Sequence, residues 1–269
     1  MMRRQTILKE LRQANPLVHC ITNIVVANFQ ANGLLALGAS PIMADSLEEA
    51  ADVAALSSCT LLNIGTLNPL TVDAMIAAGK SASANGRPLI LDPVGAGATA
   101  FRKQTIVHLL DSLDFTLIRG NAGEIAAIAG VAWQAKGVDV GSGDADITDA
   151  AKQVARQNSC LVAVTGETDI VTDGERVIRI SGGHELMSLI TGSGCLLSAV
   201  AGAFLATDSS DALHSVAECL ASYKKSGEIA AEQSFGPGDF SMNFLNTLHS
   251  IEAQDVTDDQ FHYVQEVHS

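Results

Sequence analysis

Short apolar runs, of the length that suits buried strands, alternate along the chain with longer alanine-rich runs of helical character. The apolar runs predict strands at 40–44, 59–65, 87–94, 114–120 and 159–166. The runs between them predict helices at 46–56, 68–86, 101–111 and 121–130. Strands of continuous Val, Ile and Leu character that alternate with helices indicate a mostly parallel central sheet with helices on both faces. The predicted fold class is therefore α/β.

Turn and capping residues place several boundaries in this pattern. Capping signals mark both ends of the second helix, at Asn68, Pro69 and Gly86. Asp173-Gly174 predicts a hairpin after the last of the strands, and residues beyond 190 are expected to be mostly helical. The Gly- and Asp-rich stretch 136–150 is interpreted as a loop inside the domain. Because no linker or repeat is evident, a single domain over 1–269 is predicted.

Composition narrows the classes of partner. The chain has 269 residues, of which 47% are hydrophobic, and this is ample for a large core. Its formal net charge of −14 argues against a nucleic-acid or anionic-membrane partner. Any phosphate that this protein handles must therefore be held locally, by helix N-termini, a few basic residues and a cation.

The cysteines and the apolar segments bear on the compartment. Five scattered cysteines without a CxxC pair suit a reducing environment, and they fit neither a disulfide framework nor a zinc site. The first twenty residues do not resemble a signal peptide. Residues 186–207 carry no charge, but Thr-Gly-Ser-Gly divides them into halves too short to cross a bilayer. A soluble, cytoplasmic protein without membrane contact is expected.

Two nucleotide-binding patterns occur by chance. "AMIAAGKS" (74–81) resembles a P-loop, but its first glycine is replaced by Ala74 and the segment lies within a helix. "GAGATA" (95–100) matches the dinucleotide pattern GxGxxA, but no acidic residue ends the following strand to hold a ribose. Neither pattern is interpreted as a site.

Four polar motifs fall where predicted strands end, and open α/β sheets bind ligands at that edge. They are Asp92 in "LDPVGAG", Arg119, Asn121 and Glu124 in "RGNAGE", Thr165 and Gly166 in "VTGE", and the segment "TGSGC" (191–195). Each has a purely structural interpretation as well: Asp92 as a turn cap, Glu124 as a first-turn carboxylate, and Thr165 as the start of a hairpin. Their occurrence at corresponding strand ends favours a shared site.

These motifs, together with "VHCITNIVVANFQANGLLALGASPIMA" and in order from about residue 16 to "FGPGDF" (235–240), resemble the hydroxyethylthiazole kinase family of the ribokinase-like superfamily. The resemblance implies a ribokinase-like fold. It also implies ATP- and Mg²⁺-dependent phosphorylation of the hydroxyl of 4-methyl-5-(2-hydroxyethyl)thiazole, a salvage step in thiamine biosynthesis. It further implies a homotrimer with active sites at subunit interfaces.

The resemblance also implies roles for single residues. They are substrate contact by Met43, Gly192 and Asn23, ATP contact by Arg119, Asn121 and Thr165, and magnesium binding by Asp92 and Glu124. The main-chain N–H groups of Gly192, Ser193, Gly194 and Cys195 are expected to form an anion hole for the γ-phosphoryl group. The family usually has a smaller residue at the position of Asp239, so the resemblance does not predict the structure of the loop around it.

The sequence allows two interpretations of Cys195. Superfamily relatives commonly have an aspartate base at this position, and a helix N-terminus can lower a cysteine pKa enough to give some thiolate. Alternatively, the cysteine is a small residue that fits a tight turn. Because a loose phosphoryl-transfer transition state needs little early deprotonation, Cys195→Ser or Cys195→Asp is expected to keep substantial activity, and Gly194→Val is not.

Two other functions stay open from the sequence. One is a different ribokinase-like enzyme, either a hydroxymethylpyrimidine kinase or an ATP/ADP-dependent NAD(P)H-hydrate dehydratase, which the "HCITN" block and the cysteine of "TGSGC" disfavour. The other is a non-catalytic nucleotide-binding protein, which the complete set of polar motifs disfavours.

Overall fold

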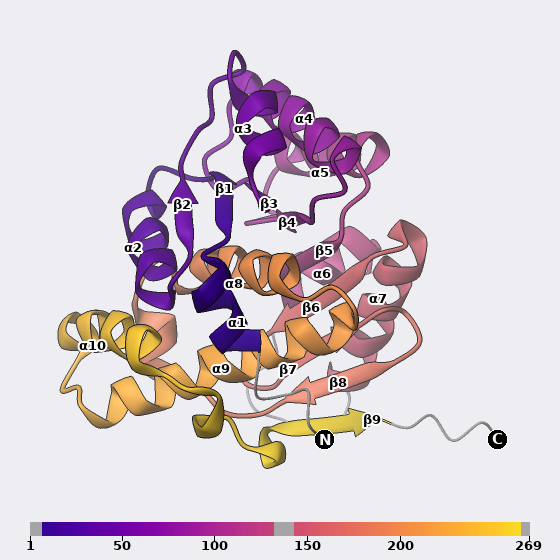
Figure 1. The fold of residues 1–269 in the computed structure, drawn as a ribbon. Helices are drawn as coiled ribbons and strands as arrows, with labels where there is room; N and C mark the ends of the chain where they lie inside the picture. Colours follow the sequence, from indigo (N-terminus) through magenta and orange to yellow (C-terminus); the bar gives the residue numbers. More distant parts are fainter. Residues whose placement is uncertain (1–6, 132–142, 265–269) are drawn as a thin grey trace.

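A nine-stranded sheet forms the centre of the computed structural model, which describes residues 7–131 and 143–264 (Figure 1). The strand order is β2-β1-β3-β4-β5-β6-β7-β8-β9. The strands are β1 (Leu17–Ile21), β2 (Ser40–Ile42), β3 (Cys59–Asn63), β4 (Leu89–Asp92), β5 (Leu117–Asn121), β6 (Leu161–Thr165), β7 (Asp169–Thr172), β8 (Val177–Ile180) and β9 (Phe261–Val264). β1 to β6 pair in parallel, and β6 to β9 pair antiparallel. The mostly parallel sheet is confirmed.

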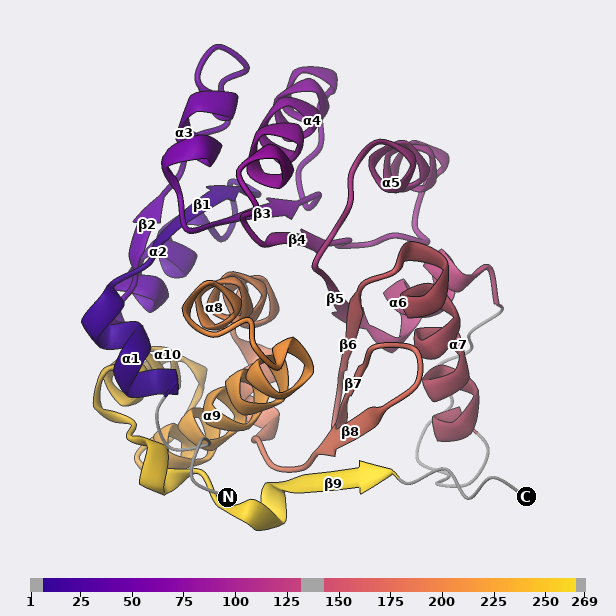
Figure 2. The same cartoon turned by 45° about the vertical axis from the view of Figure 1, so that its right-hand side comes forward.

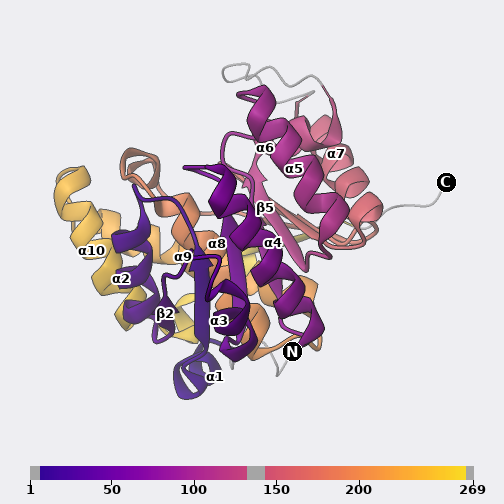
Figure 3. The ribbon, with the colours of Figure 1, turned by 90° about the horizontal axis from the view of Figure 1, so that it is seen from above.

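Helices cover both faces of this sheet, so that the molecule has three layers (Figures 2 and 3). One face carries α1 (Ile7–Ala14), α2 (Ala27–Leu37), α8 (Ser193–Thr207), α9 (Ala212–Glu232) and α10 (Pro237–Ser250). The other face carries α3 (Ala50–Leu56), α4 (Pro69–Ala84), α5 (Ala100–Ser112), α6 (Ala122–Ala129) and α7 (Gly143–Asn158). The 3₁₀ turns are η1 (Glu185–Leu189), η2 (Ala253–Asp255) and η3 (Asp258–Gln260). Each face of the sheet has its own apolar core, as a sheet buried on both sides requires.

α8 runs across the middle of the sheet, in contact with β1, β3 and β4. Small residues allow it to lie close to the strands: a Cβ at Gly202 would meet Ile90 Cδ1 at 3.0 Å and Cys59 Sγ at 3.1 Å. From Leu196 to Leu205 every residue of this helix is buried, which explains the uncharged sequence there without a membrane. In the part of the chain that the structure describes, no helix combines the length and the hydropathy needed to cross a bilayer.

Most boundary signals are confirmed. The Asn68 side chain accepts a hydrogen bond from Thr71 N (3.0 Å), and Gly86 has a φ of 63° just beyond α4. β7 and β8 form the hairpin that Asp173-Gly174 predicts, with Gly174 at a φ of 98°.

Two expectations near the chain's second half need correction. The predicted loop at 136–150 is wrong for residues 143–150, which form the first half of α7, while residues 136–142 lie outside the described residues. The acidic, Gly-containing start of this helix resembles a loop because its helical periodicity appears only from Ile147 onward. The mostly helical region after 190 also contains β9, which extends the sheet beyond β8. A four-residue edge strand with three exposed residues carries no strong strand pattern.

Candidate active site

Polar residues gather at the carboxyl-terminal edge of the parallel strands. The strand register places Asn63 of β3 beside Asp92 of β4, and Asn121 of β5 beside Thr165 of β6. Asn23 follows β1, the strand that neighbours β3 on the side away from β4. Because parallel strands end at one edge of a sheet, residues distant in sequence are thereby brought together. This edge faces the N-terminus of α8.

The N-terminus of α8 is formed by a left-handed glycine. Gly192 has a φ of 90°, and a Cβ there would lie 2.9 Å from Val26 Cγ1, so both conformation and space require glycine. The first i to i−4 hydrogen bond joins Leu196 N to Gly192 O (2.8 Å). The amides of residues 193–195 therefore precede the intrahelical ladder, which leaves them available to an anion.

Three other elements hold this turn in place. Ser193 Oγ donates a hydrogen bond to Met187 O in η1 (2.7 Å), and the Tyr223 hydroxyl in α9 donates to Ser193 O (2.6 Å). Gln30 Nε2 in α2 donates to Cys195 O (2.6 Å). A turn fixed from several sides is already in position before a ligand arrives, which lowers the cost of binding.

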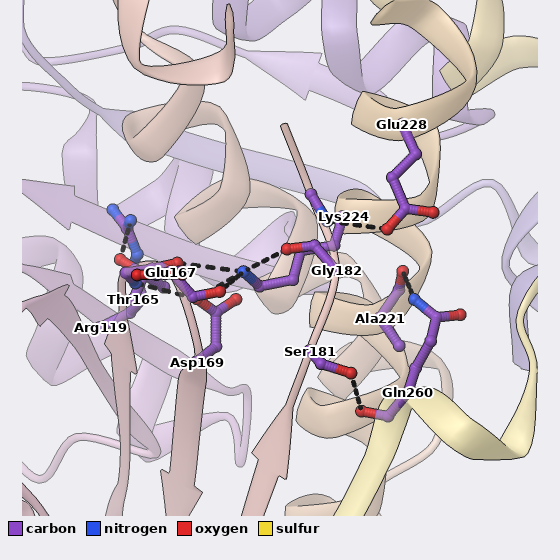
Figure 4. A network of polar contacts seen from close by, with 12 residues as sticks. Arg119, Thr165, Glu167, Asp169, Ser181, Gly182, Ala221, Lys224, Glu228 and Gln260 are labelled. Carbon is purple, nitrogen blue, oxygen red and sulfur yellow. Dashed lines mark hydrogen bonds and ion pairs between the residues drawn. The ribbon is translucent and has the colours of Figure 1, made fainter. Parts of the chain in front are cut away.

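Arg119 lies directly beneath the turn. It is a buried residue of β5, and its guanidinium donates to the Thr165 hydroxyl (Figure 4). A Cβ added at Gly194 would lie 2.8 Å from Arg119 Nη1, so the guanidinium packs against the backbone of the turn. Arg119 Nε is buried and has no hydrogen-bond partner among the described residues. The positive charge thus lies close to the free amides, as a site for a phosphate requires.

Asp92 is held from one side only. Asn63 Nδ2 (2.8 Å) and Ser198 Oγ (2.9 Å) both donate to its Oδ2, and no described residue donates to Oδ1. Burial raises the pKa of Asp92 to about 6, although the Arg119 guanidinium opposes this rise. Asp92 also lines a cavity of about 190 Å³ beside Gly192, Gly194 and Cys195. One carboxylate oxygen is therefore available to a cation in that cavity.

Glu124 and Asn121 form a reciprocal cap on α6. Asn121 Oδ1 accepts from Glu124 N (2.9 Å), and Glu124 Oε2 accepts from Asn121 N (2.8 Å). Glu124 Oε1 accepts from Gly95 N (2.9 Å). Both carboxylate oxygens of Glu124 thus accept hydrogen bonds from backbone amides, and each keeps a second lone pair for a water molecule. Both residues line the cavity of about 190 Å³ together with Asp92.

These carboxylates suit a hydrated magnesium ion. No group of three or more His, Cys, Asp or Glu side chains arranged for a metal occurs within residues 7–131 and 143–264. Mg²⁺ usually keeps several waters and binds through one or two carboxylates together with substrate phosphates. The free Oδ1 of Asp92 and the capped Glu124 fit that pattern, and Glu124 would contribute through water.

Cys195 lies in an environment that disfavours the thiolate. Burial, followed by the negative charge of Asp92, raises the pKa of Cys195 to about 11. Its Sγ accepts a hydrogen bond from Asn23 Nδ2 (3.6 Å), which also donates to Asn63 Oδ1 (2.9 Å). The expectation of some thiolate near neutral pH is therefore corrected: burial and the neighbouring carboxylate outweigh the helix N-terminus, and the side chain is a neutral thiol.

Met43 is the one predicted residue that lies apart from the others. It follows β2 at the edge of the sheet, is 37% exposed, and lines neither of the two cavities at the strand ends. Ile24 and Val25, after the neighbouring strand β1, are 83% and 64% exposed.

A second, larger cavity of about 710 Å³ lies on the other side of Arg119 and Gly194. Its volume is within the range of small-molecule sites. The sequence interpretation missed several residues that line it, which include Asp169, Gly182, Gly183, Tyr223 and Lys224. It also missed Asn63, although a polar residue at the end of the apolar run "TLLN" was a usable signal. Lys224 gave no such signal, because it lies in the middle of a helix.

The Asp239 side chain caps the N-terminus of α10. Asp239 Oδ2 accepts from Phe235 N (2.8 Å) and Oδ1 accepts from Gly236 N (2.9 Å) at the start of α10. These hydrogen bonds hold the pKa of Asp239 below its usual range. The departure from the family pattern thus has a local structural role at the N-terminus of a helix.

Comparisons with known proteins show which family this sequence belongs to. The sequence profile of the hydroxyethylthiazole kinase family matches residues 8–254. The hydroxyethylthiazole kinase of Exiguobacterium sp. is 49% identical over 248 residues, which are 92% of this chain and 94% of that protein.

Solved structures agree on the fold. The structure of the hydroxyethylthiazole kinase protein from Pyrococcus horikoshii OT3 has a TM-score of 0.89 at 36% identity, and the match covers 98% of this chain and 100% of that one. A ribokinase-like superfamily protein from Enterococcus faecalis shares the fold at 12% identity, with a TM-score of 0.62 over 90% of this chain and 94% of that one. The expected ribokinase-like fold is confirmed, and the chain belongs to the hydroxyethylthiazole kinase family.

Proposed function

We propose that this kinase transfers the γ-phosphoryl group of ATP to the hydroxyl of 4-methyl-5-(2-hydroxyethyl)thiazole, in thiamine salvage, with Mg²⁺ as cofactor. The observation that carries the proposal is the glycine turn at the N-terminus of α8, whose free amides lie against the Arg119 guanidinium. The carboxylate of Asp92 lies in the same small cavity. Membership of the family supports the choice of acceptor.

The amides of residues 193–195 stabilise negative charge on the phosphoryl group during transfer. Phosphoryl transfer passes through a loose transition state, so positioning and electrostatic stabilisation supply most of the catalysis. Arg119 adds a fixed positive charge, and the Thr165 hydroxyl orients its guanidinium. Asp92, with Glu124 through water, would hold Mg²⁺. When bound, the ion supplies charge neutralisation between phosphate oxygens.

The two cavities divide the reactants between them. The larger cavity, lined by Thr165, Gly166 and Leu197, has the room for a nucleoside, with its phosphates reaching Arg119 and Gly194. The smaller cavity lies at Gly192 and Cys195, where the acceptor hydroxyl would meet the phosphoryl group. The N-terminus of α8 lines both cavities, so the transferred group would cross at that turn.

Cys195 is assigned a shaping role at the turn. We expect Cys195→Ser to keep kcat within about tenfold of the wild-type value, because losing a general base would cost about 10²–10⁴-fold. Steady-state ADP production under saturating substrates measures this, with wild-type protein as reference. A loss of about a thousandfold in kcat, in a variant that still binds ATP, would assign the base role to the thiol instead.

A homotrimer with shared active sites accounts for the position of Met43. Exposed apolar side chains at Met43, Ile24 and Val25 lie beyond two neighbouring strands, and such a patch suits contact with another copy. We propose that this patch packs against a second subunit, so that Met43 of one subunit reaches the acceptor pocket at the smaller cavity of its neighbour.

The trimer makes a prediction for Met43. Replacing it with aspartate is expected to raise the KM for the thiazole alcohol about tenfold or more, since a charge would enter an apolar pocket, and to leave the KM for ATP near its wild-type value. Analytical ultracentrifugation of the same samples reports the assembly. A wild-type protein that sediments as a monomer at assay concentrations would refute the shared site.

The direct test is ADP production from ATP and Mg²⁺, with and without the thiazole alcohol. Alcohol-dependent ADP release supports the proposal, and hydroxymethylpyrimidine as the better acceptor would point to the related pyrimidine kinases. ATP binding in a thermal-shift titration without turnover of any acceptor would indicate a non-catalytic nucleotide-binding protein.

A further inference from the structure

A buried lysine of α9 connects two loops at the larger cavity. Lys224 is 6% exposed, and its Nζ donates to Gly166 O (3.0 Å), Glu167 O (2.9 Å) and Gly182 O (3.0 Å) (Figure 4). Gly166 and Glu167 belong to the turn between β6 and β7, and Gly182 belongs to the connection between β8 and η1. An ammonium group has three donors, so the three carbonyls use all of them.

The charge of Lys224 is balanced within the same cluster. Asp169 Oδ1 lies 3.3 Å from Lys224 Nζ and also accepts from Gly166 N (2.9 Å). Burial raises the pKa of Asp169, and the positive charge of Lys224 acts against this rise. The pair thus closes the β6–β7 turn on itself and joins it to α9.

The second loop, between β8 and η1, packs against α9 and contains two glycines in the left-handed conformation. Gly182 and Gly183 have φ values of 107° and 88°, conformations that favour glycine. Glu228 Oε1, one turn beyond Lys224, accepts from Gly183 N (3.0 Å). A side chain of α9 therefore helps to fix the path of this loop.

Both loops form walls of the larger cavity. Gly166, Glu167, Gly182 and Gly183 line it together with Lys224 itself. A buried ion pair is weak evidence for stability, because desolvation offsets much of the attraction between the charges. What this cluster does supply is a fixed distance between two loops that the chain places sixteen residues apart, from 166 to 182.

We infer that Lys224 is a positioning residue for the nucleotide, which holds the two loops at the separation that the bound nucleoside requires. This inference rests on the proposed use of ATP in the larger cavity. It assigns Lys224 no contact with the transferred group, so the acceptor side of the site does not depend on it.

The informative variant removes both charges at once. Lys224→Met alone would leave the Asp169 carboxylate buried and uncompensated, which is strongly destabilising. In the double variant Lys224→Met/Asp169→Asn, the introduced side-chain amide can still accept from Gly166 N, while the three carbonyls lose their donors. The matched control is Lys80→Met, an exposed lysine of α4 on the opposite face of the sheet.

For the double variant we expect the KM and the directly measured Kd for ATP to rise about tenfold, the effect of losing one charge-assisted interaction. The KM for the thiazole alcohol and kcat should stay within about threefold, because the turn at Gly194 is held by other residues. A cluster that only stabilises the fold would lower the apparent kcat through loss of folded protein and would leave the KM and the Kd for ATP unchanged.

An ATP Kd equal to that of wild type in the folded double variant would overturn the inference. If that variant does not fold, Lys224→Gln/Asp169→Asn, which also removes both charges but keeps two donors, decides: an ATP Kd raised about threefold or more supports the role, and an unchanged one refutes it. Wild-type protein is titrated in parallel by calorimetry. A wild type that binds no ATP refutes the proposed function, whereas a wild type that binds ATP with an unaffected variant refutes only the role of Lys224.

Discussion

Gly194→Val is expected to reduce kcat by about 10²-fold or more, the usual cost of removing a preorganised donor to a transition-state anion. A Cβ at this position would lie 2.8 Å from Arg119 Nη1 and 3.2 Å from Nη2. Arg119 is buried and bound to Thr165, so the guanidinium must leave its position or the first turn of α8 must shift. Either movement separates the positive charge from the free amides. Steady-state ADP production measures the loss.

The fold should survive this change, because the clash involves the end of a side chain and not the sheet. Urea unfolding of Gly194→Val is expected to give a free energy of unfolding within about 2 kcal/mol of wild type. Gly238→Val in α10 is the matched control, since nothing lies within 4 Å of a Cβ built there. Wild-type kcat in Gly194→Val would remove the anion hole from the mechanism.

Asp92→Asn should separate activity from stability. The asparagine oxygen can still accept from Asn63 and Ser198, but the charge that would hold Mg²⁺ is lost. We therefore expect kcat to fall about 10²-fold or more at saturating ATP. Assays over a range of Mg²⁺ concentrations measure this, with Asp52→Asn, on α3, as the control.

The same variant is expected to be more stable than wild type in the absence of Mg²⁺. A carboxyl that titrates at about 6 when folded, against an ordinary pKa of 3.8, binds its proton more tightly in the folded state. Its ionised form therefore opposes folding above about pH 6, by up to about 3 kcal/mol. The stability gained by Asp92→Asn should shrink as the pH falls from about 7.5 to about 5. Urea unfolding at both pH values tests this, and a gain that grows at low pH would contradict it.

The layered fold was predictable because burial on both faces of a parallel sheet leaves a clear mark on each strand. The runs 59–65 and 114–120 have consecutive large apolar residues at their centres, Leu61-Leu62 and Leu117-Ile118, and the turns between such runs carry capping residues such as Asn68. The start of α7 and the edge strand β9 leave no such mark. The start of α7 has few apolar residues, and β9 has only four residues of which three are exposed, so their structure depends on neighbours that the local sequence does not reveal.

The candidate site was predictable only in part. The polar ends of parallel strands must meet at one edge, which is why the sequence alone allowed Asp92, Arg119 and Thr165 to be grouped. Lys224 could not be added to them, because a lysine within a helix is usually a solvent-exposed residue. Met43 lies in the segment that resembles the family, yet in the folded chain it lies outside both cavities.

The order of residues along the chain was enough to predict the alternation of strands and helices, the family, and the glycine turn at residues 191–194. The chemical state of the site residues depends on the folded arrangement: the neutral thiol of Cys195, the carboxylate of Glu124 engaged by two amides, and the lysine that joins two loops. A pKa and a hydrogen bond both depend on groups that are close in space. Those groups come from positions far apart in the chain, and burial among them changes which charged form is stable.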